Sequence, residues 1–179
     1  MHAILRVPSG TISKLVAHLL PKGARSEEAA FGFATSASAN GRLCFDLVDW
    51  LPIEPAGFAH RSAYYLELTD QTRQMLIKRA HDLGTSLIEF HSHPSATDAD
   101  FSPSDFSGFR EFVPHLLWRL KGRPYAAFVF TRHCFDGLAW MESADSPIAV
   151  AGIEEAWRLH STTGLSFRSS NGGNDVRSL

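Results

Sequence analysis

The feature that most constrains the fold is a pair of apolar, β-rich segments, residues 28–37 and 42–53, joined by the short stretch SANGR. Its Asn40-Gly41 pair is a strong hairpin signal, because both residue types readily adopt the positive φ angles of a tight two-residue turn. The sequence therefore predicts a long antiparallel hairpin in the N-terminal third of the chain.

Further strands and helices alternate on both sides of this hairpin. Periodicity and capping residues predict strands at 3–7, 62–68, 85–90, 125–130 and 136–141, and helices at 9–20, 69–84, 102–122 (interrupted near Pro114) and 152–160. This order favours one α/β domain over residues 1–160, with a curved mixed β-sheet packed by helices. Residues 161–179 are rich in Ser, Gly and Asn, so we expect a disordered C-terminal tail.

Charge and hydropathy exclude several classes of partner. The formal net charge is −2 and the densest basic segment, RLKGR at 119–123, is short, so nucleic acid is not expected as a partner. No apolar run reaches the ~18 to 20 residues of a membrane span, and the N-terminus lacks the features of a secretory signal. With two cysteines, Cys44 and Cys134, expected to stay reduced, we predict a cytoplasmic protein.

The stretch EFHSHP, residues 89–94, follows the apolar segment TSLI. Side chains alternate along a strand, so Glu89, His91 and His93 should project to one side, with ~6.6 Å between successive members. That spacing allows two imidazoles to bind one metal ion. Pro94 then ends the strand.

A third ligand is expected from the segment SPSD, which has the pattern of a helix start. Ser102 is in the position of a cap, Pro103 is first in the helix, and Asp105 follows three residues after the cap. Two histidines and one carboxylate leave the fourth position of a tetrahedral zinc site open for a water molecule. That water needs a general base, and spacing alone does not choose among Glu27, Glu28, Glu89, Asp98 and Asp100.

HSHP followed by SPSD resembles the signature of the JAB/MPN metalloprotease family, also called JAMM, in its compact bacterial form. SEEAAFGFA, with an upstream glutamate, and the segments GRPYAAFVF and DGLAW extend the similarity over roughly residues 3–145. The resemblance implies a single α/β domain of the cytidine-deaminase-like type and a zinc-dependent hydrolase of amide bonds.

Carried over by motif position, the resemblance assigns Zn²⁺ to His91, His93 and Asp105. It assigns Glu28, rather than Glu27, as the base and Ser102 as a donor to the oxyanion. Eight residues separate His93 from Ser102, one more than is usual in the family. Asp105 is still favoured over Asp100 as the ligand, because only Asp105 has a serine three residues before it. The role of Glu89 stays open between a variable position and a partner of a ligand.

The family also implies a substrate. We expect an isopeptidase that cleaves after the C-terminus of a bacterial ubiquitin-like protein, acting beside its activating and conjugating enzymes. The tail would bind as an extended strand at a sheet edge, with residues 49–60 as a candidate rim. Two alternatives are a family peptidase that acts on a sulfur-carrier protein or small peptide, and a non-catalytic scaffold.

Overall fold

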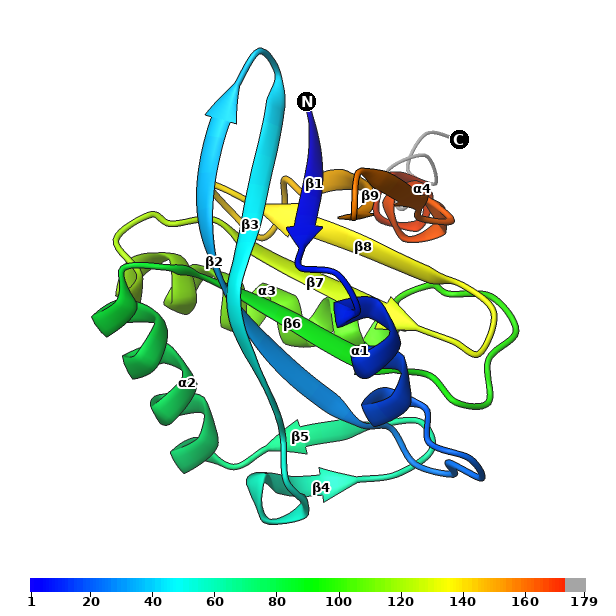
Figure 1. Ribbon diagram of the computed structural model, residues 1–179. Helices are drawn as coiled ribbons and strands as arrows, with labels where there is room; N and C mark the ends of the chain where they lie inside the picture. The colour runs from blue at the N-terminus through cyan, green and yellow to red at the C-terminus, as the bar shows by residue number, and fades with distance from the viewer. Residues whose placement is uncertain (173–179) are drawn as a thin grey trace, which may run out of the picture.

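The computed structural model describes residues 1–172. Its main sheet contains, in spatial order, β1 (His2–Val7), β3 (Arg42–Pro52), β2 (Ala29–Ala39), β6 (Ser86–Ser92), β7 (Tyr125–Phe130), β8 (Phe135–Trp140) and β9 (Ile148–Glu155). Because β1 pairs with both β3 and β9, these seven strands close into a barrel (Figure 1). The strand β10 (Arg158–Ser161) adds to β9.

The predicted fold class is therefore wrong. We expected an α/β domain of the JAB/MPN type, with a curved mixed sheet packed by helices, and the structure has a closed barrel with few helices. The closure depends on β1 pairing with β9, where Ala3 lies beside Val150. Local periodicity carries no information about a pairing between segments this far apart in the chain.

The helices are α1 (Thr11–Leu19), α2 (Asp70–Leu83), α3 (Pro103–Arg119) and α4 (Leu165–Gly172). A short 3-10 turn, η1 (Pro55–Gly57), leads into a separate two-stranded sheet of β4 (Phe58–Arg61) and β5 (Leu66–Leu68). The predicted helix 69–84 is confirmed: Thr69 caps α2 by accepting from the Thr72 amide, and Gly84 ends it in the left-handed conformation. The helix α3 continues through Pro114 without the predicted interruption.

The predicted hairpin is also confirmed. Strands β2 and β3 pair antiparallel from Ala39 and Arg42 down to Ala30 and Pro52, and Asn40 and Gly41 form the turn with φ of 51° and 74°. In Figure 1 the turn end of this hairpin extends beyond the rest of the sheet. The other end of β2 lies beside β6, where Ala29 pairs with His91, so the hairpin brings its first residues to the predicted site.

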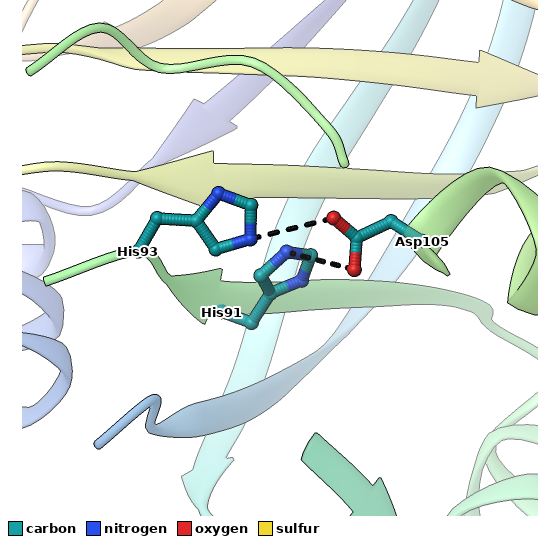
Figure 2. A group of neighbouring side chains, drawn as sticks. All are labelled: His91, His93 and Asp105. Atoms are coloured by element: carbon teal, nitrogen blue, oxygen red, sulfur yellow. Dashed lines mark ion pairs between the residues drawn. The ribbon is translucent and has the colours of Figure 1, made fainter. Parts of the chain in front are cut away.

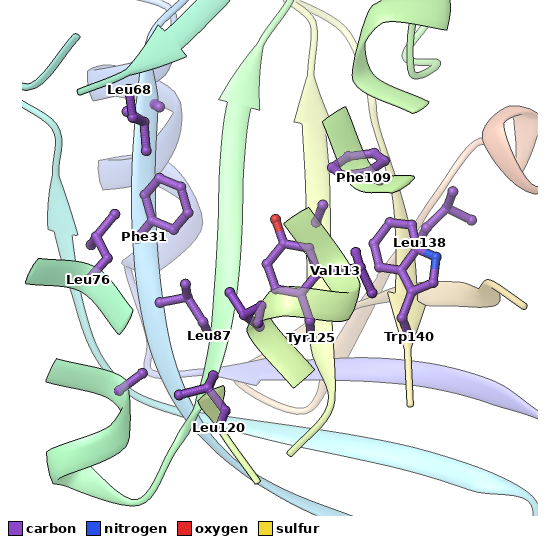
Figure 3. Close-up of a cluster of buried hydrophobic side chains, with 14 of the residues drawn as sticks. Phe31, Leu68, Leu76, Leu87, Phe109, Val113, Leu120, Tyr125, Leu138 and Trp140 are labelled. Atoms are coloured by element: carbon purple, nitrogen blue, oxygen red, sulfur yellow. The ribbon is translucent and has the colours of Figure 1, made fainter. Parts of the chain in front are cut away.

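Two apolar clusters occupy the two faces of the sheet. Every residue of β7 is buried, and alternate side chains belong to different clusters. Phe128 belongs to the first cluster, which contains residues of all seven barrel strands and of α1. Tyr125 belongs to the second cluster. The second cluster lies between the sheet and the helices α2 and α3, as Figure 3 shows for Leu76, Phe109 and Tyr125. The barrel thus has a filled interior and one helix-covered outer face.

Two predictions for the C-terminal part are wrong. Residues 152–160, expected as a helix, form the end of β9 and the start of β10, with Ala156 and Trp157 at the turn. The tail, expected to be disordered from residue 161, contains α4, in which Ser166 is fully buried. Residues 173–179 of that tail lie outside the described part.

Cys44 and Cys134 are both free, as expected. Within residues 1–172, none of the helices is long and apolar enough to cross a membrane.

Candidate metal centre

The two histidines lie at the C-terminal end of β6, the strand between β2 and β7 in the barrel. Hydrogen bonds fix this end of the strand on both sides: the Ser92 amide donates to the Glu28 carbonyl at 3.1 Å, and the His93 amide donates to the Phe130 carbonyl at 2.8 Å. The Ser92 hydroxyl, between the two histidines, accepts from the Glu28 amide at 3.0 Å. The His-x-His segment is therefore anchored to β2 and β7.

Asp105 reaches the same point from the first turn of α3. The Ser102 amide and hydroxyl donate to Asp105 Oδ2 at 2.7 and 2.8 Å, and the Asp105 amide donates back to Ser102 Oγ at 3.2 Å. This reciprocal capping arrangement, with Pro103 first in the helix, is the predicted one. It holds the Asp105 carboxylate in one orientation toward β6.

The three predicted ligands converge. The Nε2 atoms of His91 and His93 lie 3.7 and 3.3 Å from the two carboxylate oxygens of Asp105, and one ligand atom from each residue lies within 4.8 Å of the others (Figure 2). His91 Nε2 is fully buried and has no hydrogen-bond partner among the described residues. A buried nitrogen of this kind normally has a partner, and a metal ion would supply one. His91, His93 and Asp105 thus form a group that could hold a metal ion, here called the metal group.

The structure places Glu27, rather than Glu28, beside the histidines. Glu27 is buried, and its Oε1 lies 3.6 Å from His93 Nε2. Glu28, the predicted base, points away from the histidines and forms an ion pair with Arg61 of β4. Because Ala29 pairs with His91, Glu27 shares the face of the sheet that carries both histidines, whereas the side chain of Glu28 points to the opposite face.

The other carboxylates considered from sequence have different places. Asp98 is exposed, and Asp100 accepts a hydrogen bond from Ser169 of α4 at 3.0 Å, so Asp105 alone of the two predicted alternatives joins the group. Glu89 lies beside His91, with its Oε1 3.0 Å from His91 Nδ1. It also accepts from the Tyr125 hydroxyl, a partner that no sequence motif indicated.

Burial and neighbouring charges shift the pKa values of His91, Asp105 and Glu27. Burial by itself lowers the pKa of His91, but the charge of Asp105 and the hydrogen bond to Glu89 outweigh it and raise that pKa to about 9. Burial would raise the pKa of Asp105, yet the imidazoles and Ser102 hold it well below its ordinary value. Burial raises the pKa of Glu27, against the opposing effect of His91 and His93.

Two hollows flank the group. The larger, of about 580 Å³, runs between β5, α2 and α3 and reaches Glu89, His91 and Asp105. The smaller, of about 250 Å³, contains Glu27, His93 and Ser102, together with residues from the β4–β5 connection and the loop after β6. Residues 49–60, the predicted rim, line neither hollow, and β5 takes that place.

Comparison with protein-family models gives no match to this chain, and comparison with curated proteins gives no significant match.

Proposed function

We propose that this chain is a zinc-dependent peptidase or isopeptidase of the JAMM type. The observation that carries the proposal is the convergence of His91, His93 and Asp105, with Glu27 next to His93 and Ser102 next to Asp105. These five residues combine three ligands, a buried carboxylate and a hydroxyl, which is the set that metal-assisted amide hydrolysis requires.

Two imidazole nitrogens and one carboxylate oxygen suit zinc, and three protein ligands are typical of catalytic rather than structural zinc sites. When bound, the metal would supply Lewis-acid activation of a water molecule and of the scissile carbonyl. The buried unpartnered Nε2 of His91 fits a ligand role. The two unpaired cysteines agree with a reducing, cytoplasmic setting, which we also propose.

Glu27 replaces Glu28 as the proposed general base. Its Oε1 lies 3.6 Å from His93 Nε2, and both residues line the smaller hollow, where Glu27 can accept a proton and return it to a leaving amine. Burial raises the pKa of Glu27, which brings the carboxylate closer to the pH at which it both accepts and donates protons. The Ser102 hydroxyl, now donating to Asp105, lines the same hollow and can turn toward a developing oxyanion there.

The larger hollow suits an extended peptide. It is lined by Tyr65 and by all of β5, which pairs only with β4 within residues 1–172. A free strand edge can bind an extended segment through main-chain hydrogen bonds. The proposed substrate is accordingly the C-terminal tail of a ubiquitin-like protein, lying along β5 with its last carbonyl at the metal group.

A direct test uses a panel of bacterial ubiquitin-like proteins, each fused through its C-terminus to a fluorescent reporter. We expect cleavage that a chelator abolishes and added zinc restores, and no cleavage by His91→Ala. Surface histidine His81→Ala is a matched control, because its imidazole is exposed on α2. Release that persists in the presence of a chelator, or no release by zinc-loaded protein, would contradict the proposal.

A further inference from the structure

Glu89 links the metal group to the core of the protein. Its two carboxylate oxygens have different partners: Oε1 lies 3.0 Å from His91 Nδ1, and Oε2 accepts from the Tyr125 hydroxyl. The residues Glu89 and His91 are two apart on β6 and share one face, whereas Tyr125 comes from the neighbouring strand β7, where it pairs with Leu87. The carboxylate therefore bridges a ligand and a second strand.

Tyr125 is held in place by aromatic neighbours. It is fully buried, its ring stacks on Trp140 with centroids 5.6 Å apart, and the ring of Phe112 lies nearly perpendicular to it with centroids 6.0 Å apart. Figure 3 shows Tyr125 between Leu87 and Trp140, beneath α3. Burial and the neighbouring Glu89 charge raise the pKa of Tyr125 well above its ordinary value, so the hydroxyl keeps its proton and remains a donor.

We propose that Tyr125 and Glu89 are positioning residues that orient His91 for the metal. A neutral imidazole has one N–H and one free lone pair. When Nδ1–H is donated to Glu89, the lone pair lies on Nε2, and Nε2 is the atom that faces Asp105 at 3.7 Å. Tyr125 fixes the other oxygen of Glu89. Two successive hydrogen bonds, from Tyr125 to Glu89 and from His91 to Glu89, therefore set the ring plane of His91.

The chain of contacts has an energetic consequence. A carboxylate that accepts from a ligand imidazole raises the basicity of that ligand, and loss of such a partner typically lowers metal affinity about 10- to 100-fold. Glu89 is only 15% exposed, and each of its two carboxylate oxygens has a protein partner, His91 or Tyr125. The inference rests on the proposed metal site but not on peptidase activity.

The test measures zinc affinity by competition with a fluorescent chelator at one fixed pH. We expect Glu89→Gln to weaken zinc binding about 10- to 100-fold. Tyr125→Phe, which keeps the packed ring, should weaken it in the same direction by a smaller factor. Tyr125 acts on His91 only through Glu89. The double variant should therefore bind zinc almost as tightly as Glu89→Gln alone. Nitrogen NMR of the zinc-loaded wild type should show His91 with its proton on Nδ1.

Glu111→Gln is the matched control, because it removes the same charge from the lining of the same hollow without contact to His91. Zinc affinity should stay within about twofold of the wild type in this control. Equal losses in Glu111→Gln and Glu89→Gln, or a wild-type affinity in Glu89→Gln, would overturn the inference. If Glu89→Gln does not fold, Tyr125→Phe decides it alone. An effect on zinc affinity in a protein without peptidase activity would support the inference and contradict the proposed function.

Discussion

At the scale of single residues, the two adjacent glutamates have opposite environments. Glu27 is buried beside His93, and Glu28 is bound to Arg61 on the other side of the strand. Neighbouring side chains on a strand point to opposite faces, so the choice between them depends on which one shares a face with His91. The sequence indicated the candidate ligands His91, His93 and Asp105 because each lies in a local motif. Residue spacing could not choose the base, and the family resemblance assigned Glu28, because the β2–β6 register that places Glu27 beside His93 is not local.

The glutamates give the first prediction. Glu27→Gln should lower turnover of the tail-fused reporter about 10²- to 10⁴-fold, because a general base contributes about that much. Glu28→Gln should keep most of the activity, since Glu28 touches Arg61 rather than the histidines. Steady-state rates of both variants, each loaded with one equivalent of zinc, make the comparison. A larger loss in Glu28→Gln would return the role of base to Glu28.

Ser102 carries the second prediction, because it caps α3 and also lines the smaller hollow. Ser102→Ala should lower turnover about 10²-fold or more if its hydroxyl stabilises the oxyanion. It should also destabilise the fold by about 1 kcal/mol through loss of the cap. Thr69→Ala removes the equivalent cap of α2 and controls for stability, and it should leave turnover unchanged. Full activity in Ser102→Ala would refute the oxyanion role.

At the scale of elements, the C-terminal segment braces the loop that leads to Ser102. The Phe101 amide donates to Ser166 Oγ at 3.1 Å, and Thr163 Oγ1 donates to the Ala99 carbonyl at 2.9 Å. Asp136, buried at the start of β8, accepts from the Ser166 amide at 2.7 Å and so fixes the beginning of α4. A segment whose composition predicted disorder thus helps to position the metal group, through hydrogen bonds that composition does not encode.

The bracing predicts a local effect of Ser166→Ala. The variant leaves the buried Phe101 amide without its acceptor, at a cost of about 1 to 3 kcal/mol. Hydrogen exchange of the amides at 99–102 should therefore accelerate about tenfold or more, and zinc affinity should fall. Ser170→Ala is the control, because its hydroxyl bonds the carbonyl of Phe167 within α4. Unchanged exchange at 99–102 would show that α4 does not brace the loop.

At the scale of the whole molecule, local signals and long-range pairings differ in how well they could be predicted. The β2–β3 hairpin follows from Asn40-Gly41, and α2 follows from Thr69 and Gly84, because each signal lies within the element itself. Closure of the barrel needs β1 beside β9, and the turn at Ala156 and Trp157 lacks the Gly or Asn that normally marks a tight hairpin. The sequence accordingly predicted individual elements better than their arrangement.

The three side chains of the metal group come from two elements of this molecule: His91 and His93 lie at the end of β6, and Asp105 lies in the first turn of α3, outside the barrel. A metal ion bound to these three side chains would raise the free energy of unfolding by RT ln(1 + [metal]/Kd), which is about 2.7 kcal/mol when the metal concentration is a hundred times Kd. For a chain of this size, Tm should then rise by about 5 to 11 °C on addition of zinc. His91→Ala should lose this rise, whereas His81→Ala, on the exposed face of α2, should keep it. Calorimetry with and without zinc measures the shift. A zinc-dependent rise of the same size in His91→Ala would place the stabilising ion elsewhere, because the ligand that joins the barrel wall to α3 would be missing.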